Sequence, residues 1–220
     1  MNNNTVSLYT SNLAIYIDAN NSSSYSGTGT SITDLSGNGR TQNLVSASQY
    51  TVLSGVKCFD CTTTNAISAA TIGPVLPTSG FTYIAWARMI SSTAQYRTLF
   101  RTSISDHPLL INTGTNILGM WDNNGTNFNT TGYDVSSLAN VWAQWCVTGD
   151  SSGQTFYING RQVGTTSQSA AGNSHNTTGA DASPGTQMFG YVANMFLYNT
   201  KLSLREISGN YQALRSRFSV

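Results

Sequence analysis

Charged residues are scarce in this sequence. Asp, Glu, Lys and Arg together make up 9% of the 220 residues, and the formal net charge is +1. Typical domains carry about 25% charged residues. Nucleic-acid binding needs several phosphate-facing cations on one surface, and no basic run supplies them. The polar surface must come instead from Ser, Thr, Asn and Gly, which favour turns and strands. We therefore expect many short strands joined by turns, and no nucleic-acid partner.

Glutamate is almost absent, because Glu206 is the only one in the chain. Glycosidases use two carboxyl groups that flank the scissile bond, so a pair of glutamates is excluded by count. The eight aspartates are scattered, mostly in turn contexts that Asp favours for structural reasons. The two histidines, His107 and His175, have no neighbouring nucleophile motif such as Gly-x-Ser-x-Gly. We expect that the protein is not an enzyme.

Cysteine is also rare, with Cys58, Cys61 and Cys146 alone. Cys58 and Cys61 have the Cys-x-x-Cys spacing, but a structural zinc site needs four ligands and a second such pair is missing. A redox Cys-x-x-Cys opens a helix beside a βαβ unit, and the sequence shows no such unit. The odd count leaves at least one thiol unpaired. We predict reduced, partly buried cysteines, with a disulfide as the alternative.

Long apolar runs are missing as well. No segment approaches the ~20 apolar residues that a membrane-spanning helix needs, so we expect no membrane partner. The first residues, Met1 to Thr5, lack the basic and apolar regions of a secretory signal. Either the protein is made in a cytosol, or a signal was removed and a Met was added. No linker divides the chain, which predicts one domain over residues 1–220, with an N-terminal arm at 1–12.

Strand-like segments alternate with turn signals along most of the chain. The longest, Phe81–Met89, places apolar residues on both faces, which indicates that both faces are covered. Asn159-Gly160 lies between two apolar runs and predicts a two-residue β-hairpin, because both positions accept a positive φ. Further strands are expected at 13–17, 56–59, 66–72, 97–101, 108–111, 117–121, 142–148, 155–158, 161–163 and within 188–198.

The C-terminal segment changes to helical spacing. Ser203-Leu204-Arg205-Glu206 has the pattern of a capping box, in which the Ser caps the helix and Glu206 reaches back. Apolar residues then recur at helical intervals as far as Phe218. We predict a short amphipathic helix over 203–218 that closes the fold by packing its apolar stripe on a sheet. The fold class is therefore all-β, most simply a two-sheet sandwich, with this helix at the end.

Several of these motifs occur together in an order that resembles a known superfamily. They are Leu13-Ala14-Ile15-Tyr16-Ile17-Asp18-Ala19-Asn20, Asp34-Leu35-Ser36-Gly37-Asn38-Gly39, residues 81–88, 142–150 and 156–164, and Phe196-Leu197-Tyr198-Asn199 with Leu202-Ser203. Over nearly the whole chain they resemble the concanavalin A-like lectin/glucanase superfamily, in its laminin-G-like (LamG) branch. The resemblance implies an antiparallel two-sheet jelly-roll sandwich, used for glycan or protein binding or as a structural module.

The resemblance also implies a function and a location. Standalone copies that open with a Tyr-x-Asp-Ala-Asn-like strand are similar to virion proteins of large DNA viruses and phages. This implies a non-enzymatic structural or interaction module of a virion, made in the host cytoplasm, with other structural proteins of the assembly as partners. We therefore expect an oligomer or a part of a larger complex. A carbohydrate-binding, lectin-like domain with an extracellular location is the alternative.

A turn near the N-terminus is a candidate metal site. Asp34 and Asn38 lie in one tight turn, and calcium prefers such oxygen ligands. Members of the LamG branch often carry an acidic residue before the Tyr-Asn strand near the calcium position, whereas this chain has Ala193-Asn194-Met195 there. We expect no cofactor, and calcium at Asp34 and Asn38 is the open alternative.

The segment 121–128 is the candidate ligand site, because it combines aromatic rings with amide and carboxylate groups. Trp121 supplies a ring on which a sugar can stack, while Asp122 and Asn124 supply planar polar groups for its hydroxyls. Tyr133 is assigned to the same edge. The hypothesis is that these four residues bind a glycan. The alternative is that Trp121 ends a core strand and that a plain turn follows.

Overall fold

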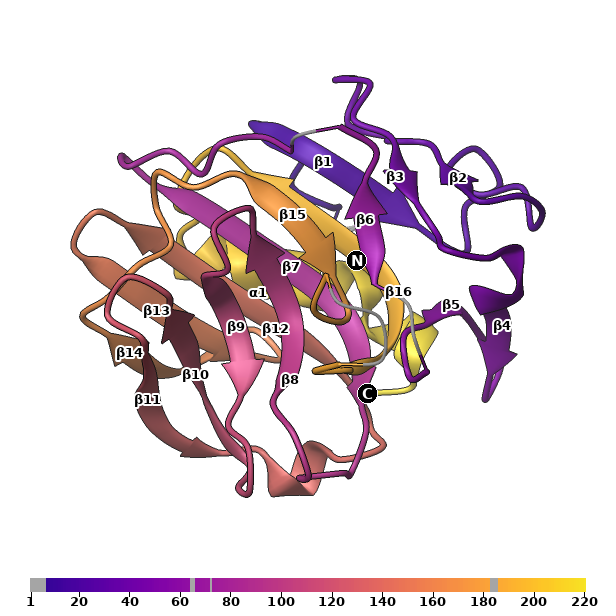
Figure 1. Cartoon of the computed structure of the whole chain (residues 1–220). Coiled ribbons are helices and arrows are strands. Elements are labelled where there is room, and N and C mark those ends of the chain that lie inside the picture. The colour runs from indigo at the N-terminus through magenta and orange to yellow at the C-terminus, as the bar shows by residue number, and fades with distance from the viewer. Residues whose placement is uncertain (1–6, 64–65, 72, 183–185) are drawn as a thin grey trace, which may run out of the picture.

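The computed structural model describes residues 7–63, 66–71, 73–182 and 186–220. These residues form two sheets that lie face to face (Figure 1). The first sheet contains, in spatial order, β14 (Arg161–Thr166), β13 (Gly153–Ile158), β12 (Trp142–Asp150), β7 (Phe81–Met89), β16 (Gly190–Tyr198), β5 (Val56–Asp60) and β4 (Tyr50–Leu53), with β1 (Leu13–Asp18) also paired to β16. The second sheet contains β11 (Asn127–Asp134), β10 (Ile117–Asp122), β9 (His107–Ile111), β8 (Arg97–Thr102), β15 (His175–Thr178), β6 (Ile67–Ala69), β3 (Gln42–Asn43) and β2 (Ser31–Ile32).

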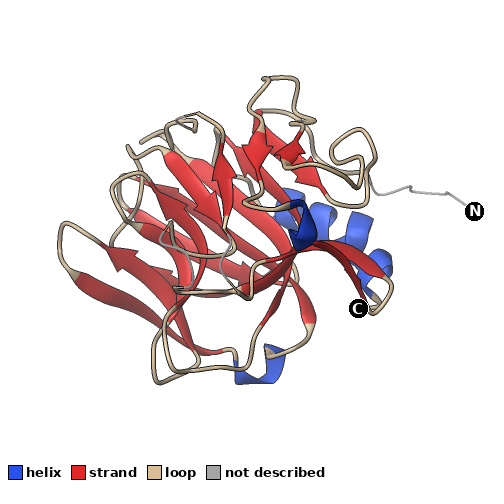
Figure 2. Cartoon of the chain, turned by 45° about the vertical axis from the view of Figure 1, so that its right-hand side comes forward, coloured by secondary structure: helices blue, strands red, loops and turns tan. Residues whose placement is uncertain are grey.

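Neighbouring strands within each sheet run antiparallel, and many of them are distant in the sequence. The central strand β7, for example, pairs with β12 on one side and with β16 on the other. The predicted all-β, two-sheet jelly-roll sandwich with a short C-terminal helix is confirmed, and Figure 2 shows the helical segments outside the strands. Those segments are α1 (Leu204–Leu214) and short 3-10 turns at Ala47–Gln49, Ser136–Leu138 and Arg215–Phe218.

The main hydrophobic core fills the space between the two sheets. Successive residues of a strand point to opposite faces. Along β7, Tyr83 and Ala85 belong to this core, while Ile84 and Trp86 face outward into two smaller clusters. The centre of the first sheet, around β7, is therefore buried on both faces, as the apolar residues on both sides of Phe81–Met89 predict.

The C-terminal helix covers the outer face of the first sheet. Its N-cap is Ser203, whose N–H donates to Glu206 Oε2 (2.7 Å), while the Glu206 N–H donates to Ser203 Oγ (3.4 Å). The predicted capping box is thus confirmed. The 3-10 turn that follows α1 stacks Phe218 on Trp86, with 4.1 Å between ring centroids. Both the start and the end of this segment are therefore fixed by specific contacts.

The predicted Asn159-Gly160 hairpin is also confirmed, between β13 and β14. The φ angles are 51° at Asn159 and 75° at Gly160. These two positive values are what a two-residue hairpin turn with a right-handed twist requires. Asn159 Oδ1 accepts a hydrogen bond from the Gln144 N–H of β12 (2.8 Å). The turn is therefore tied to the neighbouring strand.

One side of the sandwich is closed by the approach of the two terminal strands β11 and β14 (Figure 1). Gly164 of β14 lies directly against Thr131 of β11, and a Cβ at Gly164 would come within 2.6 Å of the Thr131 Cβ. No real Cβ contact is this short, so glycine is required here for the two edges to meet. The opposite side of the sandwich ends in β4 and β2.

Five strands lie outside the predicted set, namely the two-residue strands β2 and β3, and the longer strands β4, β11 and β15. β11 reads Asn-Phe-Asn-Thr-Thr-Gly-Tyr-Asp and is exposed or half-buried along its whole length, so it has no apolar alternation to detect. β15 reads His-Asn-Thr-Thr and has no apolar alternation either. Its strand conformation comes from pairing with β6 and β8. The segment 121–128 is accordingly the turn of the β10–β11 hairpin with its flanking residues, not a long loop.

Of the predicted N-terminal arm at 1–12, residues 1–6 lie outside the described residues. In the remainder, the Tyr9 N–H donates to Asn210 Oδ1 (2.7 Å), and the Tyr9 carbonyl accepts from the Tyr198 hydroxyl (2.8 Å). This part of the arm therefore packs on its own domain, against α1 and β16. Among the residues that the structure describes, none of the helices has both the length and the apolar character that a membrane span requires.

Candidate functional site

A small pocket lies on the face of the second sheet that is turned away from the main core. Leu109 and Met120 belong to that core, so Leu110 and Trp121, one residue further along each strand, point to the other side. The pocket has a volume of about 220 Å³. We call it the Trp121 pocket. It is lined by Tyr96, Ser105, His107, Leu110, Trp121, Asn123, Asp181 and Gln187.

Aromatic rings form one wall of the Trp121 pocket. Trp121 pairs across strands with His107 of β9 and with Phe128 of β11. The Tyr96 ring packs edge-on against Trp121, with 5.6 Å between ring centroids. Trp121 is half-buried, so part of its indole surface stays accessible. A half-exposed ring beside polar groups suits a ligand that has both an apolar face and hydroxyl groups.

A chain of hydrogen bonds sets the protonation of His107. The Thr98 hydroxyl donates to Gln187 Oε1 (2.7 Å) and lies 2.8 Å from His107 Nδ1. Because the hydroxyl proton is already used, Nδ1 must carry a proton and donate to the Thr98 oxygen. Burial lowers the pKa of His107 to about 4, so the ring is neutral at neutral pH. Its Nε2 is then a hydrogen-bond acceptor for a ligand hydroxyl.

The charged side chains beside the pocket are paired with one another. Arg101 Nε lies 2.6 Å from Asp181 Oδ1. A second guanidinium nitrogen of Arg101 donates to Ser105 Oγ (2.6 Å). With His107 neutral, the Trp121 pocket has no net charge. Its chemistry therefore favours an uncharged polar ligand.

Asp106 holds the rim of the pocket in place. Its Oδ1 accepts from the Asn123 N–H (2.8 Å), and its Oδ2 accepts from Asn173 Nδ2 (2.6 Å). The side chain is buried, and this burial, more than the nearby Asp122, raises its pKa above the ordinary value. Asp106 thus connects the β10–β11 turn to the loop before β15. It is a positioning residue that the sequence analysis assigns only to a turn.

The structure separates the four predicted ligand residues. Trp121 lies in the pocket. Asp122 does not line it, because Oδ1 folds back to accept the Asn124 N–H (3.0 Å) and closes the turn. Asn124 is exposed outside the pocket, and its neighbour Asn123 takes the place at the rim. The structure thus brings Asn123, and not Asp122 or Asn124, to Trp121 in the pocket, and glycan binding by these residues stays a prediction.

Tyr133 is not part of this edge. It lies five residues beyond Phe128 on β11, which at about 3.3 Å per residue places it roughly 16 Å away along the strand. It lines a different cleft, together with Gly160, Arg161 and Tyr211. The prediction that Tyr133 shares a site with Trp121 is wrong, because the residues between them form an extended strand, not a compact loop.

The predicted site lacks three residues of the pocket, namely Tyr96, Asp181 and Gln187. Each belongs to a segment far from Trp121 in the chain, and none carries a motif. His107 was considered only as a catalytic group, although its position directly before a strand was recognised. These residues meet because β8, β9 and β10 are neighbours in the second sheet and because Gln187 hydrogen-bonds to β8. No local signal in the sequence encodes that proximity.

The Asp34 turn has structural bonds at both carboxylate oxygens. Oδ1 accepts from the N–H groups of Tyr16 and Ser36 (both 2.9 Å), and Oδ2 accepts from Ser36 Oγ (2.7 Å) and the Arg40 N–H (3.0 Å). Asn38 turns its amide nitrogen, not its oxygen, to the β1 carbonyl of residue 13 (2.8 Å). The Asp34 carboxylate already accepts four hydrogen bonds, so this donor set does not fit a calcium site. Calcium binding here stays a prediction.

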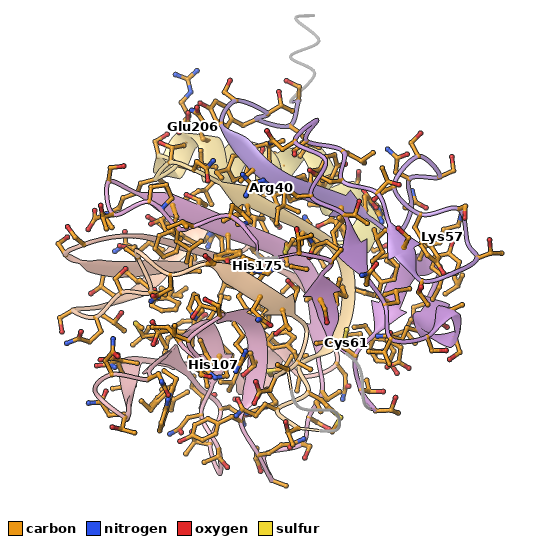
Figure 3. The ribbon with its side chains drawn as sticks, turned by 45° about the horizontal axis from the view of Figure 1, so that its top comes forward. Arg40, Lys57, Cys61, His107, His175 and Glu206 are labelled. Atoms are coloured by element: carbon orange, nitrogen blue, oxygen red, sulfur yellow. The ribbon has the colours of Figure 1, made fainter. Side chains whose placement is uncertain are left out.

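The remaining chemically active side chains are dispersed. Figure 3 shows Glu206 on the helix side, apart from His107 and His175 on the second sheet. His175 Nδ1 lies 3.0 Å from the Tyr83 hydroxyl in the core, and burial lowers the pKa of His175 to about 3. In the described part of the chain, no three His, Cys, Asp or Glu side chains gather as a metal site.

All three cysteines are free and buried. Burial is the main cause that raises the pKa of Cys58 to about 12, and it also raises the pKa of Cys61 and Cys146. These thiols therefore stay protonated at neutral pH, and protonated thiols are poor nucleophiles. The prediction of reduced cysteines is confirmed.

Comparison with known families finds a match to this chain. The family model of the concanavalin A-like lectin/glucanases superfamily matches residues 62–208. This range begins after β5 and ends inside α1, so it includes every residue that lines the Trp121 pocket. A search of curated protein sequences finds no match.

Solved structures share the fold at low sequence identity. A sialidase from Trypanosoma rangeli superposes with a TM-score of 0.69 and 13% identity, over 96% of this chain and 34% of the sialidase chain. The binding domain of botulinum neurotoxin serotype D superposes with a TM-score of 0.68 and 12% identity, over 92% of this chain and 52% of that domain. The same sialidase is also solved in complex with sialic acid. This chain thus spans about a third to a half of these structures, and the likeness establishes the fold.

Proposed function

This chain belongs to the concanavalin A-like lectin/glucanases superfamily, and from that premise we propose that it is a non-catalytic module that binds a neutral carbohydrate in the Trp121 pocket. The observation that carries the proposal is the half-exposed Trp121 ring, set beside neutral hydrogen-bonding groups in a small pocket. Sugars have apolar faces that stack on rings and hydroxyls that need directional partners. Both kinds of partner are present here.

The size and charge of the pocket support a single neutral sugar unit. Its volume of about 220 Å³ is below the roughly 300–1,000 Å³ typical of sites for drug-sized ligands. Asn123 at the rim supplies amide donor and acceptor groups, and His107 Nε2 supplies an acceptor. Because Arg101 and Asp181 neutralise each other, a charged ligand gains no partner here.

A non-catalytic role is supported by how the carboxylates are used. The sole glutamate is engaged in the capping box of α1. Asp181, the one carboxylate in the pocket lining, is ion-paired, and Asp106 holds the rim through two hydrogen bonds. Glycosidase chemistry needs one carboxyl group free to transfer a proton and a second to act on the sugar. Neither Asp181 nor the rim-holding Asp106 is free in this sense.

We predict that Trp121→Ala abolishes the binding of neutral glycans, with an affinity loss of at least about tenfold, because a central aromatic ring is the kind of residue that dominates a binding site. The measurement is a glycan array followed by calorimetric titration with the strongest neutral ligand. The thermal unfolding midpoint of the variant should stay close to that of the original protein, because Trp121 lies outside the main core.

The matched control is Tyr133→Ala, an exposed aromatic on the next strand that lies outside the pocket. This variant should keep the neutral-glycan signal. The proposal fails if the intact protein gives no array signal from any neutral glycan, or if Trp121→Ala retains full binding.

A structural role in a virion is the second candidate function, and exposed apolar residues at one sheet edge favour it. Val52 of the terminal strand β4 is 58% exposed, and nearby Val45 is 62% exposed. An unpaired strand edge with apolar side chains is a ready surface for another protein chain. Such a module would attach to the surface of a particle and bind glycans through the Trp121 pocket at the same time.

Native mass spectrometry tests this second candidate. We expect a dimer or higher oligomer at micromolar concentration, and we expect Val52→Lys to shift it towards the monomer, since a charge on an edge strand opposes pairing. Val75→Lys, at an exposed valine outside the named strands, is the control and should leave the oligomer intact. A strict monomer that associates with no particle component would contradict the assembly role.

A further inference from the structure

A second and larger cleft lies where the closed side of the sandwich meets the C-terminal helix. Its volume is about 740 Å³. It is formed by β11, the β13–β14 hairpin and α1, at a different place from the Trp121 pocket and with no residue in common. We call it the arginine cleft. Its polar and aromatic lining includes Tyr133, Arg161, Gln162, Tyr211, Gln212 and Arg215.

The charge of the arginine cleft is positive and unbalanced. Arg161 and Arg215 are both exposed, and no lining residue is acidic. Within the described residues, neither guanidinium takes part in the ion pairs, which instead join Arg101, Lys201 and Arg217 to aspartates. Asp134 follows Tyr133 in the sequence, and its carboxylate accepts a hydrogen bond from the Ser136 N–H (2.7 Å). Two cations thus face one cleft without a partner.

The walls of the cleft are regular and tightly joined elements. A Cβ at Gly160 would lie 3.2 Å from both Ser208 Cα and Tyr211 Cβ, so the hairpin turn packs directly on α1. The other face of Tyr211 stacks on the buried Trp86, with 5.7 Å between ring centroids. A site built on rigid elements loses little entropy when a ligand binds.

We propose that the arginine cleft binds an acidic oligosaccharide through its carboxylate or sulfate groups. The planar guanidinium of arginine matches such groups with two parallel hydrogen bonds. The Gln162 and Gln212 amides offer both donors and acceptors to sugar hydroxyls. Tyr133, which is 37% exposed, offers a ring face for a sugar. This proposal does not rest on the neutral-sugar site. It concerns other residues, and it requires a negatively charged ligand where the Trp121 pocket requires a neutral one.

The shape of the cleft separates this ligand from other anions. A volume of about 740 Å³ far exceeds what one inorganic anion fills, and it falls in the range of sites for multi-ring ligands. One way in which an extended peptide binds is by adding a strand to a free sheet edge. Here the edge of β14 is already covered by β11, where Gly164 meets Thr131. The cleft therefore offers no free edge for a peptide strand.

The test is calorimetric titration of the full chain with five probes at low ionic strength. The probes are a galacturonic acid tetrasaccharide, a chondroitin sulfate tetrasaccharide, neutral maltotetraose, sodium sulfate and a hexaglutamate peptide. We expect at least one acidic tetrasaccharide to bind at least about tenfold more tightly than maltotetraose and sulfate. The carboxylate and sulfate probes identify which anionic group is preferred. Binding should weaken as salt is added, because exposed charges are screened.

Arg161→Gln and Arg215→Gln should each weaken the binding of the acidic tetrasaccharide by at least about tenfold, because each removes a charge-assisted hydrogen-bond partner. The double variant should abolish it. Arg205→Gln is the matched control, since Arg205 is exposed on the same helix but lines another surface. Trp121→Ala should also leave this binding unchanged. Circular dichroism confirms the fold of each variant, and both targeted arginines are exposed enough for folding to persist.

Several results would overturn the proposal. They are equal binding of the neutral and acidic tetrasaccharides, binding of sulfate alone as tight as that of the oligosaccharides, and tighter binding of a hexaglutamate peptide. Retention of full affinity in the Arg161→Gln/Arg215→Gln double variant would do the same. Loss of the acidic ligand in Trp121→Ala would place it in the other pocket. None of these results bears on neutral-glycan binding, so the two proposals fail separately.

Discussion

Replacing Phe218 with alanine is expected to lower the free energy of unfolding by about 3–5 kcal/mol, the usual cost of removing a buried aromatic ring. Phe218 is 3% exposed although only two residues follow it in the sequence. Its ring stacks on Trp86 at 4.1 Å with an interplanar angle of 5°, and it also contacts Trp142 at 5.5 Å. Removing it uncovers two tryptophans on the outer face of the first sheet.

Urea denaturation, followed by tryptophan fluorescence, measures this effect. Leu204→Ala on the same helical segment is the control, because Leu204 is 53% exposed and alanine is a good helix former. It should change stability by less than about 0.5 kcal/mol. Equal stability of the two variants would mean that the C-terminal segment does not contribute to the core in solution.

Acidification from pH 7.5 to pH 5 is expected to cost about 4 kcal/mol of stability through two buried histidines. Burial lowers the pKa of His107 to about 4 and of His175 to about 3, from an ordinary value of 6.5. The unfolded state therefore binds more protons between pH 6.5 and the folded pKa values, and stability falls as pH falls. Each pH unit below 6.5 costs about 1.4 kcal/mol per histidine, or about 2 kcal/mol each at pH 5.

The sign can be checked with His175→Gln, which removes one titrating group from the core. This variant will be less stable at pH 7.5, because it loses the fit beside Tyr83. Its loss of stability between pH 7.5 and pH 5 should nevertheless shrink by about 2 kcal/mol. Asp106 has the opposite effect on the pH dependence of stability. Its pKa in the folded state is raised above the ordinary value of 3.8, so its protonation favours the folded state as pH falls. Both proteins carry Asp106, so its contribution cancels when the variant is compared with the original protein. An unchanged pH dependence in His175→Gln would contradict the argument.

The predictable parts of this structure are those whose signals are local. The Asn159-Gly160 turn and the Ser203–Glu206 cap depend on residues a few positions apart, and both occur as predicted. The burial of both faces of Phe81–Met89 can be predicted from the apolar residues of that strand alone. β11 and β15 have no such pattern, because Asn and Thr adopt strands there only through pairing with neighbours.

The candidate site shows the same limit. Trp121 could be found because an aromatic ring among amides is visible in the sequence. Its partners Tyr96, His107 and Gln187 come from separate segments, and only the strand order of the second sheet brings them together. Tyr133 was misplaced for a related reason. Residues close in sequence lie far apart when the chain between them is extended, as it is along β11.

The contact between Gly164 and Thr131 also determines how copies of this protein can join. With β11 and β14 sealed against each other, strand addition is blocked on that side, and β4 and β2 remain at the other (Figure 1). Two copies that pair through β4 would use the same surface on each partner, which is a closed two-fold arrangement. In such a pair the sealed side offers no second edge for further addition, and at the open side only the two-residue strand β2 of each copy stays as a terminal strand. The sealed side therefore prevents strand addition at one side of the sandwich, which favours finite pairs over fibres.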